Sequence, residues 1–391
     1  MTLSLSPAHQ VFAGFAIYSF AMGNLFPRLA DVQTDMGVTT SALGLGLIGA
    51  PIGTLVSLTF ATRTLERLGF HRVLPLAIPL LAALYALAVR APSPAMLFAL
   101  LIPVGVTIGC IEIMLNAEAD RTEHMLGRRI MNRSHAFWSI GFFTAGLFGA
   151  QLAALGLTPQ LHLALVVPIV ALASFLALRG YVPSPPRHVE GADDTPHFAV
   201  PTWGILLIVI VTIPAMLLEG ASMDWSAIYM RDAFGSDKFW QGIAVSCFAI
   251  TQALMRFFAD GVVERTSPAT LARILFLSLG IGCLVVVFSA NPLLSLAGFA
   301  AMGLGTSAIF PLAMSAAARR TDRSSALNIA ALAQFSFLMF LLGPPLLGFV
   351  AHGFGIRMAF GLSLPLIVVS LATAGALGRT SAKTRSQQRS A

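Results

Sequence analysis

Apolar segments of about twenty residues recur along the whole chain, and they constrain the fold more than any other feature of the sequence. A helix needs about 20 apolar residues to cross a hydrocarbon core of about 30 Å. In such a core every backbone polar group must be satisfied internally, as it is in a helix. The sequence therefore predicts an all-α membrane protein.

The apolar segments form two groups of six, which predicts twelve transmembrane helices in two six-helix bundles. The expected spans lie near residues 8–28, 40–60, 73–90, 95–117, 134–155, 160–180, 203–225, 240–261, 269–290, 293–316, 325–350 and 355–378. We expect an N-terminal bundle over 1–181, a cytoplasmic linker over 182–201 rich in proline and charge, a C-terminal bundle over 202–378, and a polar, disordered cytoplasmic tail over 379–391.

Charged residues are too few for a soluble protein of this size. They make up 10% of the chain, whereas soluble domains carry about 25%. The basic residues are scattered in short loops, so the net charge of +7 does not indicate nucleic-acid binding. Three separate cysteines lie in apolar segments and are expected to be small buried side chains rather than metal ligands.

The arginines are concentrated in alternate loops, which predicts the orientation of the helices. One set of loops holds most of them, including Arg63, Arg67, Arg72, Arg121, Arg128, Arg129, Arg133, Arg319, Arg320 and Arg323, and the other set holds few. Loops rich in Lys and Arg stay in the cytoplasm. We therefore expect a multi-pass protein of the inner (plasma) membrane, with an even number of crossings and with both termini and the linker in the cytoplasm.

A short internal repeat links the two predicted bundles. The loop after the second span reads Leu65-Glu66-Arg67-Leu68-Gly69, and the loop after the eighth reads Val263-Glu264-Arg265-Thr266-Ser267. The two loops hold equivalent places in the two groups of six. Such repeats are a feature of secondary transporters.

The first of these loops resembles the signature Gly-x-Leu-Ala-Asp-Arg-x-Gly-Arg-Lys of the major facilitator superfamily. Glu66, Arg67 and Gly69 match it in type, whereas Thr62 and Phe70 depart from it. The resemblance covers the whole chain and implies transport by alternating access, with substrate bound among helices 1, 4, 7 and 10.

Three further segments are similar to a poorly characterised branch of bacterial inner-membrane permeases near the fucose permeases. They are Glu112–Ala119, Gly127–Gly141 and Glu219–Ser226. That branch usually has Asp where Glu112 stands. The resemblance indicates the class of mechanism and leaves the cargo open.

Glu112 is the leading candidate for a proton-carrying residue. It lies about sixteen residues, or about 24 Å, into the fourth span. Glu112, Asn116 and Asp120 follow an i, i+4, i+8 spacing and share one helix face. An ionisable side chain inside a span is costly and indicates function by default, although a structural hydrogen bond to a neighbouring helix is the alternative.

The seventh span carries two acidic residues, Glu219 and Asp224. Pro214 removes a backbone donor one turn before Glu219, so we expect the helix to bend or break there. Carboxylates at broken helices suit substrate or ion sites. The alternative for Asp224 is an interfacial residue near the outer end of the span.

Asn24 and Arg28 lie one turn apart near the outer end of the first span. Arg28 could bind an anionic group of a substrate, or it could reach the interface or pair with Asp31. The sequence leaves these three roles of Arg28 open.

A cytoplasmic gate is predicted near the inner end of the eighth span. Arg256 and Asp260 share a face there beside Glu264 and Arg265. Together with Glu66, Arg67 and Gly69, they would hold the cytoplasmic side closed.

His135 opens the fifth span and is a possible pH-sensitive group, or a helix-start residue bonded to a loop. Glycines at 44, 46, 49 and 53 predict close helix packing.

The sequence predicts a transporter and no enzyme, cofactor or metal site. It has no nucleotide-binding loop and no hydrolase motif, so an ion gradient or the substrate's own gradient must supply the energy. The leading hypothesis is proton-coupled transport of a sugar or other small polar metabolite by a monomer in the lipid bilayer. The alternatives are proton-antiport efflux of drugs or metabolites and, further off, a non-transporting membrane sensor.

Overall fold

The structure, a computed structural model, describes residues 5–185 and 199–378, and every regular element within them is an α-helix or a short 3-10 helix. Eleven helices or consecutive helix pairs among these residues are long and apolar enough to cross a membrane. The remaining predicted span corresponds to α1 (Pro7–Gly23), whose 17 residues extend about 26 Å before the chain continues through a 3-10 turn. The predicted all-α membrane fold is confirmed.

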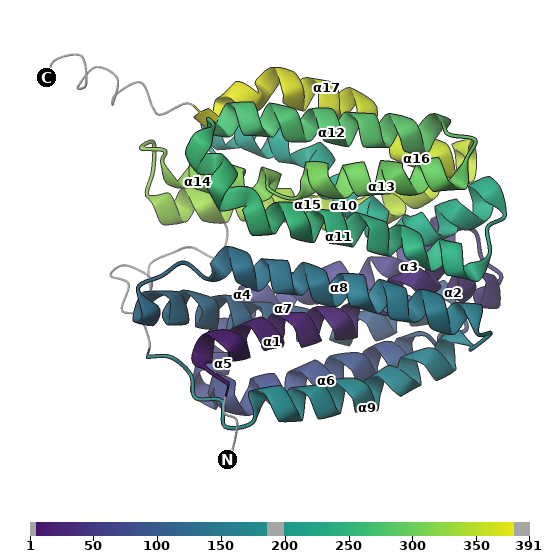
Figure 1. Cartoon of the computed structure of the whole chain (residues 1–391), viewed down its shortest axis with the longest axis horizontal. Helices are drawn as coiled ribbons and strands as arrows, with labels where there is room; N and C mark the ends of the chain where they lie inside the picture. Colours follow the sequence, from purple (N-terminus) through teal and green to yellow (C-terminus); the bar gives the residue numbers. More distant parts are fainter. Residues whose placement is uncertain (1–4, 186–198, 379–391) are drawn as a thin grey trace, which may run out of the picture.

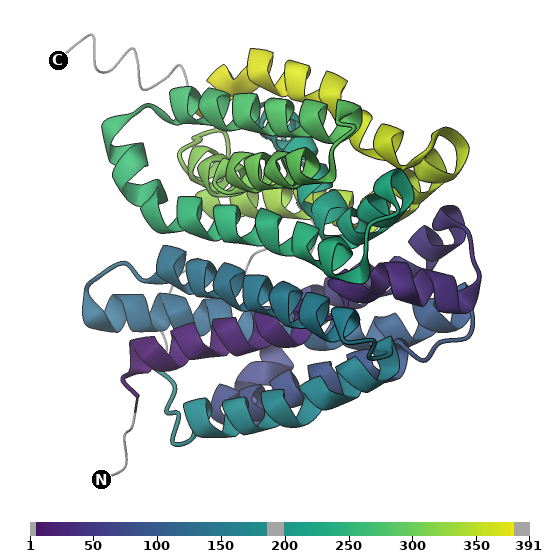
Figure 2. The same cartoon turned by 45° about the vertical axis from the view of Figure 1, so that its right-hand side comes forward.

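The helices form two groups that lie face to face (Figures 1 and 2). The N-terminal group contains α1, η1 (Phe26–Arg28), α2 (Leu29–Met36), α3 (Thr40–Leu47), α4 (Gly49–Phe60), α5 (Thr62–Leu68), α6 (Phe70–Ala88), α7 (Pro94–Leu126), α8 (Met131–Ala154) and α9 (Pro159–Leu178). The C-terminal group contains α10 (Trp203–Phe234), α11 (Lys238–Arg265), α12 (Pro268–Phe288), α13 (Pro292–Thr306), α14 (Ile309–Ala318), α15 (Ser325–Phe354), α16 (Ile356–Gly361), α17 (Ser363–Thr373) and η3 (Ala374–Gly378). Most of the predicted linker and all of the predicted tail lie outside the described residues.

The basic loops gather at one end of the molecule, which we call the basic end. It holds the segment 61–69, which contains the short helix α5, and the loops at 127–130 and 319–324. Figure 1 shows α5 and α14 at this end, on the left. Arg121 of α7 pairs there with Glu66 of α5 at 3.6 Å. The predicted alternation of basic loops therefore corresponds to two distinct ends of the helix bundle.

Several helices begin with a capping residue followed by proline. Ser93, Thr158 and Ser267 each accept a hydrogen bond from the backbone of the first turn, and a proline follows each of them. The cap satisfies one of the free N–H groups, and proline at the first position needs no such partner. These pairs explain why the observed helix starts agree with the predicted spans to within a few residues.

Pro214 does not break its helix, because α10 runs from Trp203 to Phe234 without interruption. Of the predicted bend or break, the break is therefore wrong. Proline lacks the N–H that would bond the carbonyl four residues earlier, which is that of Ile210. The hydroxyl of Ser370 on α17 lies 3.3 Å from this oxygen and donates to it. A neighbouring helix thus satisfies the freed carbonyl, and the helix continues.

A break occurs instead between α13 and α14, within the tenth predicted span. Pro311 cannot donate to the carbonyl of Ser307, which is left free. Here the donor comes from a charged side chain, since Nε of Arg256 lies 3.2 Å from the Ser307 oxygen. The break between α13 and α14 therefore lies where the chain meets Arg256.

The glycines of α3 and α4 pack closely against neighbouring helices, as predicted. A methyl group at Gly49 or Gly53 would collide with the backbone of α7, and one at Gly46 would lie 3.1 Å from the Pro94 carbonyl oxygen at the start of that helix. A methyl group at Gly44 would lie 2.5 Å from the carbonyl oxygen of Pro344 on α15, in the other group. Most glycines of this span thus contact a helix of the N-terminal group, whereas Gly44 contacts the C-terminal group.

Candidate functional site

A large cavity of about 1860 Å³ lies between the two helix groups. Glu66, Arg129 and Arg319 line it at the basic end, and Glu112, Glu219 and Arg256 line it within the spans. The N-terminal group contributes α4, α5, α7 and α8, and the C-terminal group contributes α10, α11, α14 and α15 among others. The cavity therefore reaches from the basic loops to the ionisable residues predicted from the sequence.

Glu112 and Asn116 stand on the same face of α7 and face this cavity, as their spacing predicted. Nδ2 of Asn116 donates to Oε2 of Glu112 at 2.8 Å. The hydroxyl of Tyr18, on α1, donates to Oε1 at 2.9 Å. Both carboxylate oxygens thus accept a hydrogen bond from an uncharged donor, which fixes the side chain. Arg256 acts on this carboxylate only at longer range, and the described contacts include no ion pair of Glu112.

Glu219 provides the second carboxylate of the cavity and is paired with a cation. Nη2 of Arg256 lies 3.3 Å from Oε1 of Glu219, and Nε2 of Gln252 donates to the same oxygen at 2.9 Å. Gln252 and Arg256 are four residues apart on α11 and so share a face. The Glu219–Arg256 pair is therefore neutral overall.

Arg256 also connects the two groups. Its Nη1 donates to the hydroxyl of Ser139 on α8 at 3.2 Å, while its Nε donates to Ser307 of the C-terminal group. The sequence placed Arg256 in a gate with Asp260 and Glu264, whose side chains lie outside the described residues. That gate remains a prediction, and the described partners of Arg256 place its guanidinium at the cavity.

The signature loop lies at the mouth of the cavity. Glu66 pairs with Arg121 of the same helix group, and the guanidinium of Arg121 also lies over the ring of Phe70, 4.9 Å from its centre. Gly69 has φ +84, a conformation that favours glycine, and it forms the sharp joint between α5 and α6. Arg67, together with Arg265 of the equivalent loop, is exposed at the basic end.

Asn24 and Arg28 are not brought to the cavity. Oδ1 of Asn24 lies 2.8 Å from Nε2 of His162, which joins α1 to α9. Arg28 is fully buried, pairs with Asp31 at 2.7 Å and donates to the carbonyl of Leu157. Of the alternatives left open by the sequence, the structure shows the ion pair with Asp31.

Asp224 is also away from the described cavity lining. It is half-buried on α10, beyond Glu219 toward the end opposite the basic loops. The structure therefore separates the two acidic residues of this helix, and only Glu219 lines the cavity.

The two groups are joined at the end opposite the basic loops. Lys238 of the C-terminal group lies 2.9 Å from Asp31 of the N-terminal group. Nη2 of Arg231 donates to Gln33 at 2.6 Å, and the hydroxyl of Thr40 donates to the carbonyl of Gly348 at 3.1 Å. We call these three contacts the latch. They join the two helix groups at the end opposite the basic end.

The walls of the cavity combine polar and apolar side chains. Its polar lining includes Thr306, Ser307, Gln334 and His135, and the His135 ring lies 5.2 Å from that of Phe15. Its apolar lining includes Met216, Phe310, Phe337 and Phe340. Such a lining can bind a solute that has hydrogen-bonding groups and an apolar surface.

Several residues of the site were not singled out from the sequence. The position of Gln252, one turn before Arg256, was a usable signal, and so was the hydroxyl of Tyr18 within an apolar span. Ser139 resembles any small residue of a packed helix. Outside the cavity lining, no role was assigned from the sequence to Glu118, which is 1% exposed and accepts a hydrogen bond from the backbone of Ser184, just past α9.

Known proteins match the chain over nearly its full length. An uncharacterized transporter of Sinorhizobium fredii is 31% identical over 371 residues, covering 93% of this chain and 97% of that protein. The sequence profile of the Major Facilitator Superfamily matches residues 208–391. The chain belongs to the major facilitator superfamily.

Other members of the superfamily share this fold. An uncharacterized MFS-type transporter of Yersinia pestis is 25% identical over 93% of this chain and 94% of its own length. A bacterial homolog to the human lysosomal transporter Spinster, solved in an inward-facing and occupied conformation, has a TM-score of 0.73 at 13% identity, over 95% of this chain and 97% of that chain. A mutant of the nucleoside transporter NupG has a TM-score of 0.71 at 12% identity, over 96% and 100%.

The protein is thus a multi-pass membrane transporter of the major facilitator type and not an enzyme. Its cavity is consistent with that class, because it lies between the two helix groups and reaches the middle of the spans. Among the described residues no group of three or more His, Cys, Asp or Glu side chains could hold a metal ion.

Proposed function

We propose that this transporter moves a small polar solute by alternating access, coupled to protons, with Glu112 as the proton carrier. One observation carries the proposal: the Glu112 carboxylate lines the cavity and is held only by the uncharged donors Tyr18 and Asn116 among the described contacts. Desolvation disfavours the charged form of such a carboxylate. Uptake or release of one proton changes the charge of this side chain by one unit.

The neighbouring charges support the same assignment. Arg256 neutralises Glu219 at 3.3 Å, so this second carboxylate is already paired. With both acids ionised, the pair and Glu112 together carry one uncompensated negative charge. Binding of one proton at Glu112 makes the centre of the cavity neutral, which lowers the cost of closing the cavity away from water.

The arrangement of the two ends supports an alternating-access cycle. The cavity reaches the basic end, and the latch joins the groups at the other end. Basic loops remain in the cytoplasm by the positive-inside rule. The conformation is then inward-open, in the inner membrane, and residues 1–181 and 202–378 would move as the two halves.

This orientation can be tested by fusing a reporter after Ala391 and inserting a second one near Gly191. Both should report the cytoplasm. A periplasmic signal at either site would contradict the orientation and the even number of crossings that it requires.

The polar lining supports a solute such as a sugar or a small polar metabolite, because Asn116, Thr306, Ser307 and Gln334 offer hydrogen bonds. A second candidate is efflux of a cationic, partly apolar compound in exchange for protons. It is favoured by the apolar lining at Met216, Phe310 and Phe337 together with the uncompensated charge of Glu112. In that case the solute and the proton would compete for the same carboxylate.

A thermal-shift screen of the purified protein would distinguish the two candidates. A true ligand stabilises the folded protein by mass action. Stabilisation by sugars or polyols that persists in Glu112→Gln supports the first candidate. Stabilisation by organic cations that is lost in Glu112→Gln and weakens at low pH supports the second.

A further inference from the structure

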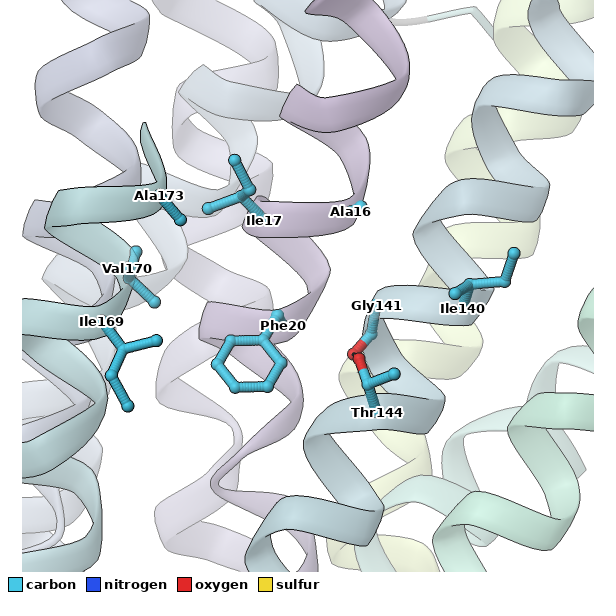
Figure 3. A pocket seen from close by; sticks show the side chains of 9 residues that line it. All are labelled: Ala16, Ile17, Phe20, Ile140, Gly141, Thr144, Ile169, Val170 and Ala173. Carbon is cyan, nitrogen blue, oxygen red and sulfur yellow. Dashed lines mark hydrogen bonds between the residues drawn. The ribbon is translucent and has the colours of Figure 1, made fainter. Parts of the chain in front are cut away.

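A second pocket lies outside the cavity, on the surface of the N-terminal group (Figure 3). It has a volume of about 190 Å³ and is formed by three helices, α1, α8 and α9. Ile17 and Phe20 of α1 lie between Ile140 of α8 on one side and Ile169, Val170 and Ala173 of α9 on the other. Ile140 is 40% exposed and Ile169 is 42% exposed, so the pocket is a groove open to the outside of the bundle.

The interior of this groove suits a hydrocarbon chain. Thr144 contributes its one hydroxyl group, which donates to the carbonyl of Gly141 at 2.8 Å and so has a partner already. The remaining lining side chains are apolar. In a membrane an apolar groove of this kind faces lipid tails rather than water.

The three helices carry basic residues at one end and no acidic residue. Their sequences contain no Asp or Glu from Pro7 to Gly23, from Met131 to Ala154 or from Pro159 to Leu178. His9, Arg133 and Arg179 are exposed at the basic end of α1, α8 and α9. Each lies six or seven residues from the groove along its helix, or about 9–11 Å.

The contacts near the groove bring these three helix ends together. Nε2 of Gln10 lies 3.4 Å from the carbonyl of Ala177 and 3.5 Å from that of Arg179, which joins the start of α1 to the end of α9. The rings of Phe12 and Phe137 stack at 4.9 Å and join α1 to α8. The three helix ends that carry the basic residues therefore lie together, at the end of the groove nearer the basic loops.

We propose that this groove is a binding site for an anionic diacyl phospholipid of the leaflet at the basic end. One acyl chain lies in the groove against Ile17 and Phe20, and the phosphate group lies among His9, Arg133 and Arg179. Basic residues attract anionic headgroups, and α1, α8 and α9 carry no acidic residue of their own. Glu123 of α7 lies at the start of α8, where its carboxylate accepts hydrogen bonds from the backbone N–H groups of Ile130 and Met131. The site is separate from the cavity and does not depend on the identity of the transported solute.

Native mass spectrometry of the full-length protein tests the acyl-chain part of the site. The protein is titrated with dioleoyl phosphatidylglycerol or dioleoyl phosphatidylcholine, and the first bound lipid is quantified. We expect phosphatidylglycerol to bind more tightly, and Ala173→Phe or Ile169→Trp to reduce its binding by filling the groove. Leu172→Phe is the matched control, because Leu172 is on the same helix, 60% exposed and outside the groove lining.

The headgroup part is tested with Arg133→Gln and Arg179→Gln. Each should weaken phosphatidylglycerol binding by about fivefold, whereas Arg90→Gln, exposed at the opposite end, should not change it. Equal binding of the two lipids, or unchanged binding in both groove-filling variants, would overturn the proposal. Displacement of the lipid by inorganic phosphate would indicate an anion site without a role for the groove and would overturn it as well.

Discussion

Arg256 of the C-terminal group donates to Ser139 of the N-terminal group, with 3.2 Å between Nη1 and Oγ. The same guanidinium lies 3.3 Å from the carboxylate of Glu219. A single cation therefore neutralises an acid in its own group and contacts the opposite group within the spans. Any movement of one group against the other must change the Ser139 contact, whereas the Glu219 pair can persist.

We expect Arg256→Gln to destabilise the protein by about 1–3 kcal/mol, because it leaves the mostly buried Glu219 carboxylate without its charged partner. The double variant Arg256→Gln/Glu219→Gln should recover most of this loss, since neither charge then remains. Thermal unfolding of the detergent-purified variants measures both effects. A double variant as unstable as the single one would show that Arg256 acts through Ser139 and Ser307 rather than through the ion pair.

We expect Glu112→Gln to exchange substrate but not to accumulate it against a gradient. Gln is nearly isosteric with protonated Glu and can keep the partners Tyr18 and Asn116, but it cannot release a proton. A proton gradient then can no longer favour one of the two conformations, inward-open or outward-open, over the other. Proteoliposomes with an imposed pH gradient, assayed for counterflow and for accumulation once a substrate is known, measure the two activities.

Tyr18→Phe is the control for the Glu112 variant, because it removes one hydrogen bond and keeps the titrating group. It should accumulate substrate, although with altered pH dependence. Accumulation at the wild-type level by Glu112→Gln would instead move the proton role to Glu219 or Asp224.

We expect Lys238→Ala to open the latch more often but not to abolish it. Lys238 is 54% exposed, and an exposed pair contributes about 0.2–1 kcal/mol. The ratio of open to closed latch should therefore rise by about 1.5- to 5-fold. A cysteine introduced at Thr40, with Cys110, Cys247 and Cys283 replaced by serine, reports the opening through labelling by an impermeant maleimide.

High salt should reduce the difference between Lys238→Ala and the parent, because salt screens exposed charges. Arg90→Gln at the same end of the molecule should leave the labelling unchanged. Equal labelling in Lys238→Ala and its parent at low salt would exclude this ion pair from the latch.

We expect Asp322 to stabilise the protein at neutral pH and to lose this effect in acid. Partial burial raises its pKa, but hydrogen bonds from Thr202, Arg320 and Asn328 outweigh this and lower the pKa from 3.8 to about 2. A lowered pKa in the folded state stabilises that state above the unfolded value, and the effect is lost as pH falls from about 4 to about 2. The contacts join the loop before α15 to the start of α10.

The midpoint of thermal unfolding should therefore be lower for Asp322→Asn than for wild type at pH 7 and pH 5. The difference should shrink below pH 4. Asp237→Asn, at an exposed position of the opposite end, is the comparison. A difference that stays constant down to the lowest accessible pH would mean that the carboxylate charge is not what stabilises this contact.

The spans could be predicted because membrane crossing depends on local properties of the sequence, namely length, apolarity and caps such as Ser93. The i, i+4 spacing likewise placed Glu112 and Asn116 together correctly. What local reasoning missed depends on a partner from a distant helix. Pro214 and Pro311 look alike in sequence, because each frees one backbone carbonyl. Ser370 donates to the Ile210 carbonyl that Pro214 frees, and Arg256 donates to the Ser307 carbonyl that Pro311 frees.

The same limit applies to Arg28 and Arg256. Each had an acidic residue three or four positions away, at Asp31 and Asp260 respectively. The local partner is observed for Arg28, whereas the described partner of Arg256 is Glu219, from another helix. Sequence spacing cannot rank a nearby carboxylate against one that tertiary packing brings to the same place.

The contact between Gly44 and Pro344 offers a way to trap the transporter in its other state. A methyl group at Gly44 would lie 2.5 Å from the Pro344 carbonyl oxygen of the opposite helix group. We expect separation of the two groups at the latch end to relieve this clash. Gly44→Ala should therefore favour the outward-open state, whereas Gly49→Ala collides with α7 inside one group and should lower stability in every state. More labelling at Thr40→Cys in Gly44→Ala, without a lower unfolding midpoint, is the expected result. Such a variant would be a suitable immunogen for raising antibodies that select one state.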